Sequence, residues 1–129
     1  MQEKIKILLV DDEQKNIKIL LEILEFEEEY IVESALSGRE CLELIPDFKP
    51  DILLLDIMMP DLNGYEVCKQ IRNNSDYSSM KIMMLSGRAM QDEIDKGMAA
   101  GADLYISKPF SMTELLDALK VLWEQVDNS

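Results

Sequence analysis

The sequence predicts a single α/β domain built on a parallel β-sheet. Five short apolar runs, rich in Ile, Leu, Val and Met, alternate along the chain with segments whose apolar residues recur every three to four positions. This alternation is typical of strands joined by crossover helices, and buried parallel strands have near-continuous apolar runs of this kind. With 129 residues and 47% hydrophobic content, the chain is long enough for one core and too short for two ordinary domains. We therefore expect one domain over residues 1–129.

Each predicted strand leads into a predicted helix. The strands are expected at residues 5–10, 30–35, 51–55, 81–85 and 104–107. The helices are expected at residues 14–26, 37–45, 64–73, 90–100 and 112–124. Two helix starts carry a serine three residues before a glutamate, a pair that satisfies free backbone N–H groups: Ser37 with Glu40, and Ser111 with Glu114. Gly101 follows the fourth predicted helix, where a residue with positive φ commonly ends a helix.

The predicted helices differ in how strongly they should pack. The first and last carry apolar residues at spacings of three and four, and these stripes are expected to face the core. The stripes consist of Ile17, Leu20, Leu21 and Leu24 in the first helix and Leu115, Leu116, Leu119 and Leu122 in the last. The fourth helix is weaker, because Gly97 in its interior costs about 1 kcal/mol relative to alanine. We expect the fourth helix to be the most mobile.

Charge and apolar run length exclude several classes of partner and location. The chain has 13 basic and 26 acidic residues, and its formal charge of −13 would repel nucleic-acid phosphates and anionic membrane surfaces. The first apolar run, Ile5 to Val10, is too short for a signal peptide, and no run approaches the roughly 20 residues that span a bilayer. Cys41 and Cys68 lie in helical segments and are interpreted as buried thiols. We expect a cytoplasmic protein that contacts neither nucleic acid nor membrane directly.

The absence of histidine limits the chemistry further. Histidine is the commonest general base and metal ligand, so Ser-His or Cys-His catalysis and histidine-based zinc sites are excluded. Any reaction must use carboxylates, hydroxyls and lysine.

Polar residues stand where the predicted strands end. Asp11 and Asp12 follow the first strand, Asp56 the third, Ser86 the fourth and Lys108 the fifth. Parallel strands place their carboxyl ends at one edge of the sheet, so these residues should converge there. Three carboxylates about 5 Å apart repel by roughly 3 kcal/mol per pair at an effective dielectric constant near 20. A divalent cation and Lys108 are the expected compensators, and an all-oxygen ligand set favours Mg²⁺, with Mn²⁺ as a possible substitute.

Each of these residues also has an ordinary structural interpretation. An aspartate pair after a strand commonly caps the next helix, and an aspartate that ends an apolar run commonly forms a turn. Ser86 alone would be a loop hydroxyl, Lys108 a surface lysine and Tyr105 strand filling. The joint placement of the residues at one edge is what favours a site. Several acidic residues outside this edge are interpreted as solvated or turn positions: Asp51, Asp61, Asp92, Asp95 and residues 27–29.

These residues resemble the receiver (CheY-like) family of two-component signalling over essentially the whole chain. The resemblance rests on the aspartate pair, on Leu-Asp-Ile-Met-Met-Pro-Asp-Leu-Asn-Gly around Asp56 and on Ser-Lys-Pro-Phe around Lys108. It implies a flavodoxin-like, doubly wound (βα)5 fold with strand order 2-1-3-4-5. It further implies that Asp56 is the phosphoacceptor, that Lys108 and Ser86 assist catalysis, and that Ser86 and Tyr105 are the switch residues.

The resemblance also implies a metal-ligand set. Asp12 and Asp56 would bind Mg²⁺ directly, Asp11 mainly through water, and the backbone carbonyl of Met58 would add a ligand. A cis peptide bond before Pro109 is implied as well, which X-Pro statistics alone would rate at about 5–6%. Met58 and Arg88, each two residues beyond a site residue, are expected to influence how long a phosphoryl group persists.

The function implied is that of a phosphorelay signalling domain. The phosphoryl group would come from a phosphohistidine on a histidine kinase or histidine phosphotransfer protein, and a conformational switch would alter the face formed by the fourth helix, fifth strand and fifth helix. A downstream effector protein or domain would read that face. The domain would catalyse only its own phosphorylation and dephosphorylation, and we expect no output domain in this chain.

Three alternatives compete with this interpretation. A haloacid-dehalogenase-type phosphatase would need a second aspartate at the position of Met58. A flavodoxin-like FMN carrier would not place Asp11, Asp12 and Glu13 after the first strand, where they would repel a phosphate. A degenerate receiver that acts only as a phosphorylation-independent interaction module is the third alternative.

Overall fold

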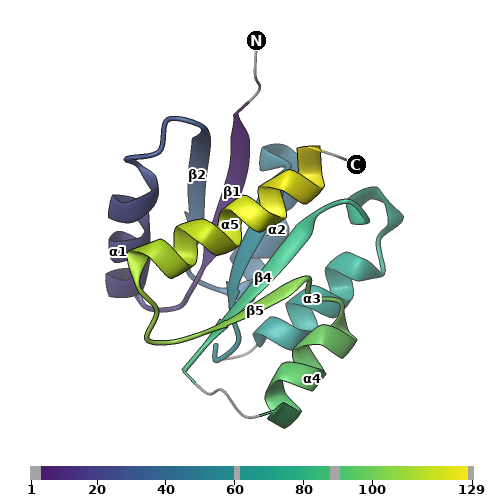
Figure 1. The fold of residues 1–129 in the computed structure, drawn as a ribbon. Helices are drawn as coiled ribbons and strands as arrows, with labels where there is room; N and C mark the ends of the chain where they lie inside the picture. The colour runs from purple at the N-terminus through teal and green to yellow at the C-terminus, as the bar shows by residue number, and fades with distance from the viewer. Residues whose placement is uncertain (1–3, 60–61, 88–90, 128–129) are drawn as a thin grey trace.

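A computed structural model describes residues 4–59, 62–87 and 91–127 (Figure 1). All five strands are parallel and form one sheet in the order β2-β1-β3-β4-β5. Their bounds are β1 Ile5–Val10, β2 Tyr30–Ala35, β3 Ile52–Asp56, β4 Lys81–Ser86 and β5 Leu104–Ser107. The predicted doubly wound fold and its strand order are confirmed.

The helices cover both faces of the sheet. Their bounds are α1 Gln14–Leu24, α2 Gly38–Phe48, α3 Gly64–Arg72, the short 3₁₀ helix η1 Ser75–Tyr77, α4 Gln91–Ala100 and α5 Met112–Asp127. Helices α1 and α5 pack on one face, and α2, α3 and α4 pack on the other (Figure 1). Within the described residues, no helix combines the length and apolarity needed to cross a bilayer.

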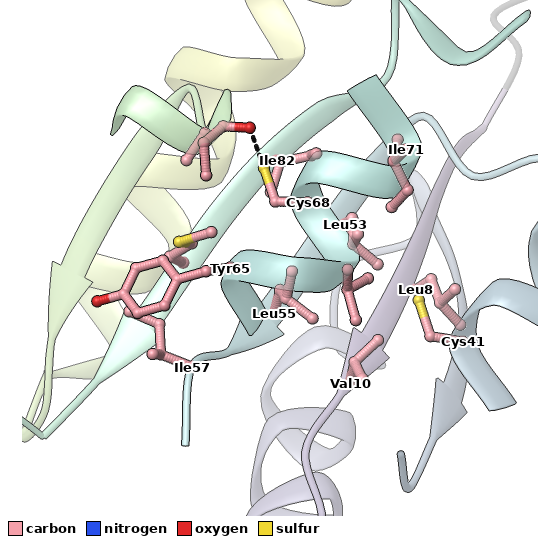
Figure 2. Close-up of a cluster of buried hydrophobic side chains, with 14 of the residues drawn as sticks. Leu8, Val10, Cys41, Leu53, Leu55, Ile57, Tyr65, Cys68, Ile71 and Ile82 are labelled. Atoms are coloured by element: carbon pink, nitrogen blue, oxygen red, sulfur yellow. Dashed lines mark hydrogen bonds between the residues drawn. The ribbon is translucent and has the colours of Figure 1, made fainter. Parts of the chain in front are cut away.

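Two apolar cores result because successive side chains of a strand point to opposite faces. Leu8 and Val10 of β1 face the core under α2 and α3, which Figure 2 shows in close-up, whereas Ile7 and Leu9 face the core under α1 and α5. Strand β3 lies at the centre of the sheet and every one of its residues is buried. The predicted stripes of α1 and α5 are buried through Ile17, Leu20, Leu24, Leu115, Leu119 and Leu122. Cys41 and Cys68 are buried free thiols, as predicted.

The start and stop signals of the helices are largely confirmed. The Ser37 hydroxyl accepts a hydrogen bond from the Glu40 N–H at 3.1 Å, and the Ser111 hydroxyl accepts from the Glu114 N–H at 3.0 Å. The Glu114 carboxylate accepts in return from the Ser111 N–H at 3.4 Å. Gly101 ends α4 with a φ of 112°. These caps fix where the helices begin and end relative to the sheet.

Some predicted boundaries were wrong. Helix α2 runs through Pro46 to Phe48 instead of ending at residue 45, because Pro46 lies in its last turn and Lys49 closes the helix with a φ of 53°. Helix α1 ends at Leu24 instead of residue 26, and the helix η1 was not predicted. Asp51, interpreted as a solvated or turn residue, is a half-buried bend residue whose carboxylate accepts from the Lys6 N–H at 2.9 Å. Asp61 and residue 90 lie outside the described residues.

Gly97 has a packing role that composition does not reveal. A Cβ at this position would lie 3.0 Å from the Met84 sulfur and within 3.7 Å of both Tyr105 and Tyr65. The glycine therefore lets α4 approach β4 and β5 closely. The expected mobility of α4 stays a prediction.

Candidate functional site

The ends of four strands bring the predicted residues together. Asp11 and Asp12 follow β1 and Asp56 ends β3, and one carboxylate oxygen of each lies within 4.8 Å of the others. Lys108 follows β5, and its Nζ lies 3.4 Å from Asp11 Oδ2 and 3.9 Å from Asp56 Oδ1. Ser86 ends β4 and is fully buried. Residues separated by up to 97 positions in sequence thus share one edge of the sheet.

Asp11 is held in place by its own loop, by helix α1 and by Lys108. The side chain is buried, and its Oδ1 accepts from the Glu13 N–H at 2.9 Å. Its Oδ2 accepts from the Asn16 side-chain amide at 3.2 Å and from Lys108 at 3.4 Å. The N-cap of α1 is Glu13, which makes no side-chain cap hydrogen bond. The helix-cap interpretation therefore does not account for the aspartate pair, and Asn16 is a support that the sequence analysis missed.

Asp56 is a carboxylate in an unfavourable environment. It is 6% exposed, and burial, followed by the charge of Asp11, raises its pKa from 3.8 to about 6. Lys108 and the Met58 N–H, which donates to Asp56 Oδ1 at 3.3 Å, lower the pKa but do not cancel the increase. A cation bound to the three carboxylates would relieve this cost, and their oxygens suit a hard ion such as Mg²⁺. The residues therefore fit the metal that the sequence predicts.

The loop after β3 is shaped by Gly64, the first residue of α3. A Cβ on Gly64 would lie 2.7 Å from the Asp56 carbonyl oxygen and 2.9 Å from Ile57 Cα, so the start of α3 packs directly on the backbone of the candidate phosphoacceptor. Asn63 caps α3 by accepting from the Glu66 N–H at 3.0 Å. Sequence reasoning missed both roles, although an Asn-Gly pair before a helix is a usable signal. Met58 is 59% exposed beside the site.

The fourth and fifth strands position the remaining candidates. The Lys108 N–H donates to the Ser86 carbonyl at 2.6 Å, which joins the end of β4 to the lysine. The Lys108–Pro109 peptide bond is cis, as the resemblance implies. Tyr105 is half-buried on β5, opposite Met84 of β4. Arg88 lies outside the described residues.

Comparisons with known proteins agree with this geometry. The sequence profile of the response regulator receiver domain matches residues 7–120. The response regulator MprA of Mycolicibacterium vanbaalenii is 42% identical over 118 residues, which cover 92% of this chain and 50% of MprA. A CheY-like receiver domain protein from Methanospirillum hungatei superimposes with a TM-score of 0.89 at 34% identity, covering 98% of this chain and all of that one (100%). The chemotaxis protein CheY4 of Vibrio cholerae superimposes with a TM-score of 0.87 at 31% identity, covering 92% of this chain and 98% of CheY4.

The chain belongs to the response regulator receiver domain family. It is a signalling domain with the CheY-like form of the flavodoxin fold. The chain spans about half the length of the curated relatives it matches.

Proposed function

We propose that this domain accepts a phosphoryl group on Asp56 and signals through the resulting conformational change. The observation that supports this most directly is the buried Asp56 carboxylate with a raised pKa, placed beside two further carboxylates and one lysine. Three mutually repelling carboxylates at one sheet edge destabilise the fold. A phosphoacceptor site that binds a divalent cation would explain their placement.

Asp12 and Asp56 would hold Mg²⁺ directly, with Asp11 acting mainly through water and the Met58 carbonyl as a further ligand. Mn²⁺ could take its place. When bound, the ion supplies positive charge that offsets the negative charge of the phosphoryl oxygens. The fixed position of Asp11, held by Glu13 and Asn16, prepares this ligand set before any ion arrives.

Asp56 would act as the nucleophile without help from a general base. With a pKa of about 6, its carboxylate is mostly ionised at neutral pH. An Asp56 oxygen attacks the phosphorus in line, the new O–P bond forms, and the P–N bond to the donor imidazole breaks. Lys108, 3.9 Å from Asp56, would neutralise a phosphoryl oxygen during transfer. The domain thereby catalyses its own modification through positioning and charge.

The switch would combine several small contributions. Phosphorylation leaves about −1.5 to −2 of charge on Asp56, which Ser86 and Lys108 can engage. Moving a two-state equilibrium from 1:99 to 99:1 needs about 5.5 kcal/mol, and one charge-assisted hydrogen bond contributes roughly 1.5–3 kcal/mol. Ser86 must therefore act together with Lys108 and with a movement of Tyr105. The surface of α4, β5 and α5 would change as a result.

The partners follow from this chemistry. The chain has no histidine, so a phosphohistidine donor must lie on another protein or domain, and a histidine kinase or histidine phosphotransfer protein is the proposed donor. A downstream effector protein or domain would bind the α4-β5-α5 face. The formal charge of −13 disfavours direct binding to nucleic acid or an anionic membrane, and the cytoplasm is the proposed location.

Phosphate uptake from acetyl phosphate tests the proposal. With Mg²⁺, intact-mass spectrometry should show one phosphate on the parent chain and none on Asp56→Asn. Asp47→Asn, which removes an exposed carboxylate from α2, is the matched control and should behave like the parent. Stoichiometric phosphate on Asp56→Asn would refute the acceptor assignment, and no uptake by the parent would favour the phosphorylation-independent interaction module.

A further inference from the structure

Tyr65 joins the phosphoacceptor loop to α4. It is the second residue of α3, its side chain is buried, and Figure 2 shows its ring beside Ile57 in the core under α2 and α3. The Tyr65 hydroxyl donates a hydrogen bond to the backbone carbonyl of Glu93 in α4 at 3.2 Å. Burial and nearby acidic groups raise the pKa of Tyr65, so the hydroxyl remains a donor across the ordinary pH range.

The face of α4 that receives Tyr65 is fitted closely to it. A Cβ at Gly97 would lie 3.7 Å from Tyr65 Cε1 and 3.6 Å from Tyr105 Cδ2, so both tyrosine rings pack at this glycine. One residue earlier, Lys96 places its Nζ 4.7 Å from the centroid of the Tyr65 ring, within the range of a cation–π contact. Tyr65 therefore meets α4 at three residues: its hydroxyl bonds to Glu93, and its ring lies against Lys96 and Gly97.

The other side of Tyr65 is tied to the site itself. The preceding residue, Gly64, donates its N–H to the Ile57 carbonyl at 3.1 Å and packs against the Asp56 carbonyl. Only one peptide unit separates this contact from Tyr65. A shift of the Asp56–Ile57 backbone and a shift of α4 must therefore both be accommodated at Tyr65.

We propose that Tyr65 is a positioning residue that holds α4 in the conformer described here and restrains its rearrangement when Asp56 is phosphorylated. This inference rests on the proposed function. If α4 moves away from α3 on phosphorylation, the bond between Tyr65 and Glu93 breaks, and its loss opposes the switch. Removing the hydroxyl alone lowers that opposition and leaves the ring, its apolar packing and its contact with Lys96 in place.

Beryllofluoride, which mimics a phosphoryl group on aspartate, provides the measurement. Its affinity in excess Mg²⁺ would be measured by titration, following backbone amide NMR shifts, for the parent and for Tyr65→Phe. One neutral hydrogen bond corresponds to a factor of about 3 to 10 in the equilibrium, so Tyr65→Phe should bind beryllofluoride about 3- to 10-fold more tightly. Lys96→Gln should give an increase of about twofold, because this cation is exposed to solvent.

Tyr77→Phe is the matched control. Tyr77 lies in η1, near the edge where the strands begin. The affinity of Tyr77→Phe for beryllofluoride should stay within about twofold of the parental value. If the role of Tyr65 were purely structural, Tyr65→Phe would lower the free energy of unfolding without changing the affinity for beryllofluoride. Unchanged or weaker binding in Tyr65→Phe would therefore overturn the proposal.

Hydrogen exchange separates this inference from the proposed function. Without any phosphoryl mimic, the amides of α4 should exchange faster in Tyr65→Phe than in the parent, and those of α2 should not. If the parent fails to bind beryllofluoride, the proposed function is wrong, and the exchange of α4 alone decides whether Tyr65 restrains that helix. Equal exchange of α4 in the two proteins would show that it does not.

Discussion

The two edges of the sheet hold their charged groups in opposite ways. At the amino edge, where the strands begin, Arg72 donates to the carbonyls of Gly101 at 2.8 Å and Met80 at 2.7 Å. It also forms an ion pair with Asp103 at 2.8 Å, and the same oxygen of Asp103 accepts from the Ile82 N–H at 2.8 Å. These short, matched contacts tie α3, β4 and the loop before β5 together.

At the carboxyl edge the contacts are longer and the charges are unbalanced. Lys108 lies 3.4 and 3.9 Å from two of the three clustered carboxylates, and the pKa of Asp56 is raised to about 6 despite this lysine. We infer that the amino edge stabilises the fold, whereas the clustered carboxylates of the carboxyl edge lower its stability. The largest effect on stability is expected at the amino edge.

Arg72→Met should lower the free energy of unfolding by about 3 kcal/mol, because it removes several close hydrogen bonds and leaves Asp103 without its cation. Urea unfolding would measure the change. Lys69→Met, which removes an exposed cation from the same helix, should change stability by less than about 0.5 kcal/mol. Phosphate uptake per folded molecule should stay within twofold of the parent. A loss below about 1 kcal/mol would contradict the stabilising role of this edge.

The second test concerns the stability that the fold loses by burying the ionised carboxylate of Asp56. A carboxyl group whose folded pKa is raised stabilises the fold below its unfolded pKa and loses that contribution as the pH rises through the folded value. In EDTA, Asp56→Asn should therefore be more stable than the parent by up to about 3 kcal/mol at pH 8. The difference should shrink as the pH falls through about 6 toward 4.

Urea unfolding at a series of pH values would measure this difference. Millimolar Mg²⁺ at pH 8 should raise the thermal midpoint of the parent more than that of Asp56→Asn, because the ion relieves the repulsion that the variant has already lost. A pH-independent difference between the two proteins would mean that the burial of Asp56 carries no charge penalty.

The sequence predicted the two edges unequally. Strand ends marked by Asp11, Asp56, Ser86 and Lys108 indicated the carboxyl edge, because polar residues that interrupt apolar runs stand out in a linear pattern. Arg72 and Asp103 gave no such signal, since each is one of many charged residues, and their pairing depends on the packing of α3 against the start of β4 and β5. Contacts of this kind arise only from tertiary geometry.

The same limit applies to glycine. Gly97 indicated a weak helix in the sequence, whereas the structure places it against Met84, Tyr65 and Tyr105. A propensity scale records what glycine costs a helix, and it cannot record what a missing Cβ allows neighbouring elements to do. The main helices followed from periodicity, and the strand order followed from the resemblance to the receiver family. The end of α2 followed from neither, because the helix continues through Pro46 to Phe48 although proline is disfavoured beyond the first turn of a helix.

The smallest expected effect concerns how long the phosphoryl group lasts at the carboxyl edge. Hydrolysis needs a water in line with the phosphorus, and an amide side chain near Asp56 could orient that water. Met58 offers no effective donor or acceptor, and we expect its thioether to cover part of the approach. Its side chain is 59% exposed, so Met58→Asn should change the free energy of unfolding little. We expect the phosphorylated parent to lose phosphate more slowly than Met58→Asn, by a few-fold.

Decay of the phosphorylated proteins in excess Mg²⁺, followed by fluorescence or by intact mass after removal of acetyl phosphate, would measure the two rates. Met58→Leu is the matched control, because it keeps an apolar side chain of similar volume and should decay at the parental rate. Faster decay in both variants would show that the thioether acts mainly by covering the site. Equal or slower decay in Met58→Asn would mean that water is placed by other residues, and the carboxyl edge would then depend less on this position than its exposed location beside Asp56 suggests.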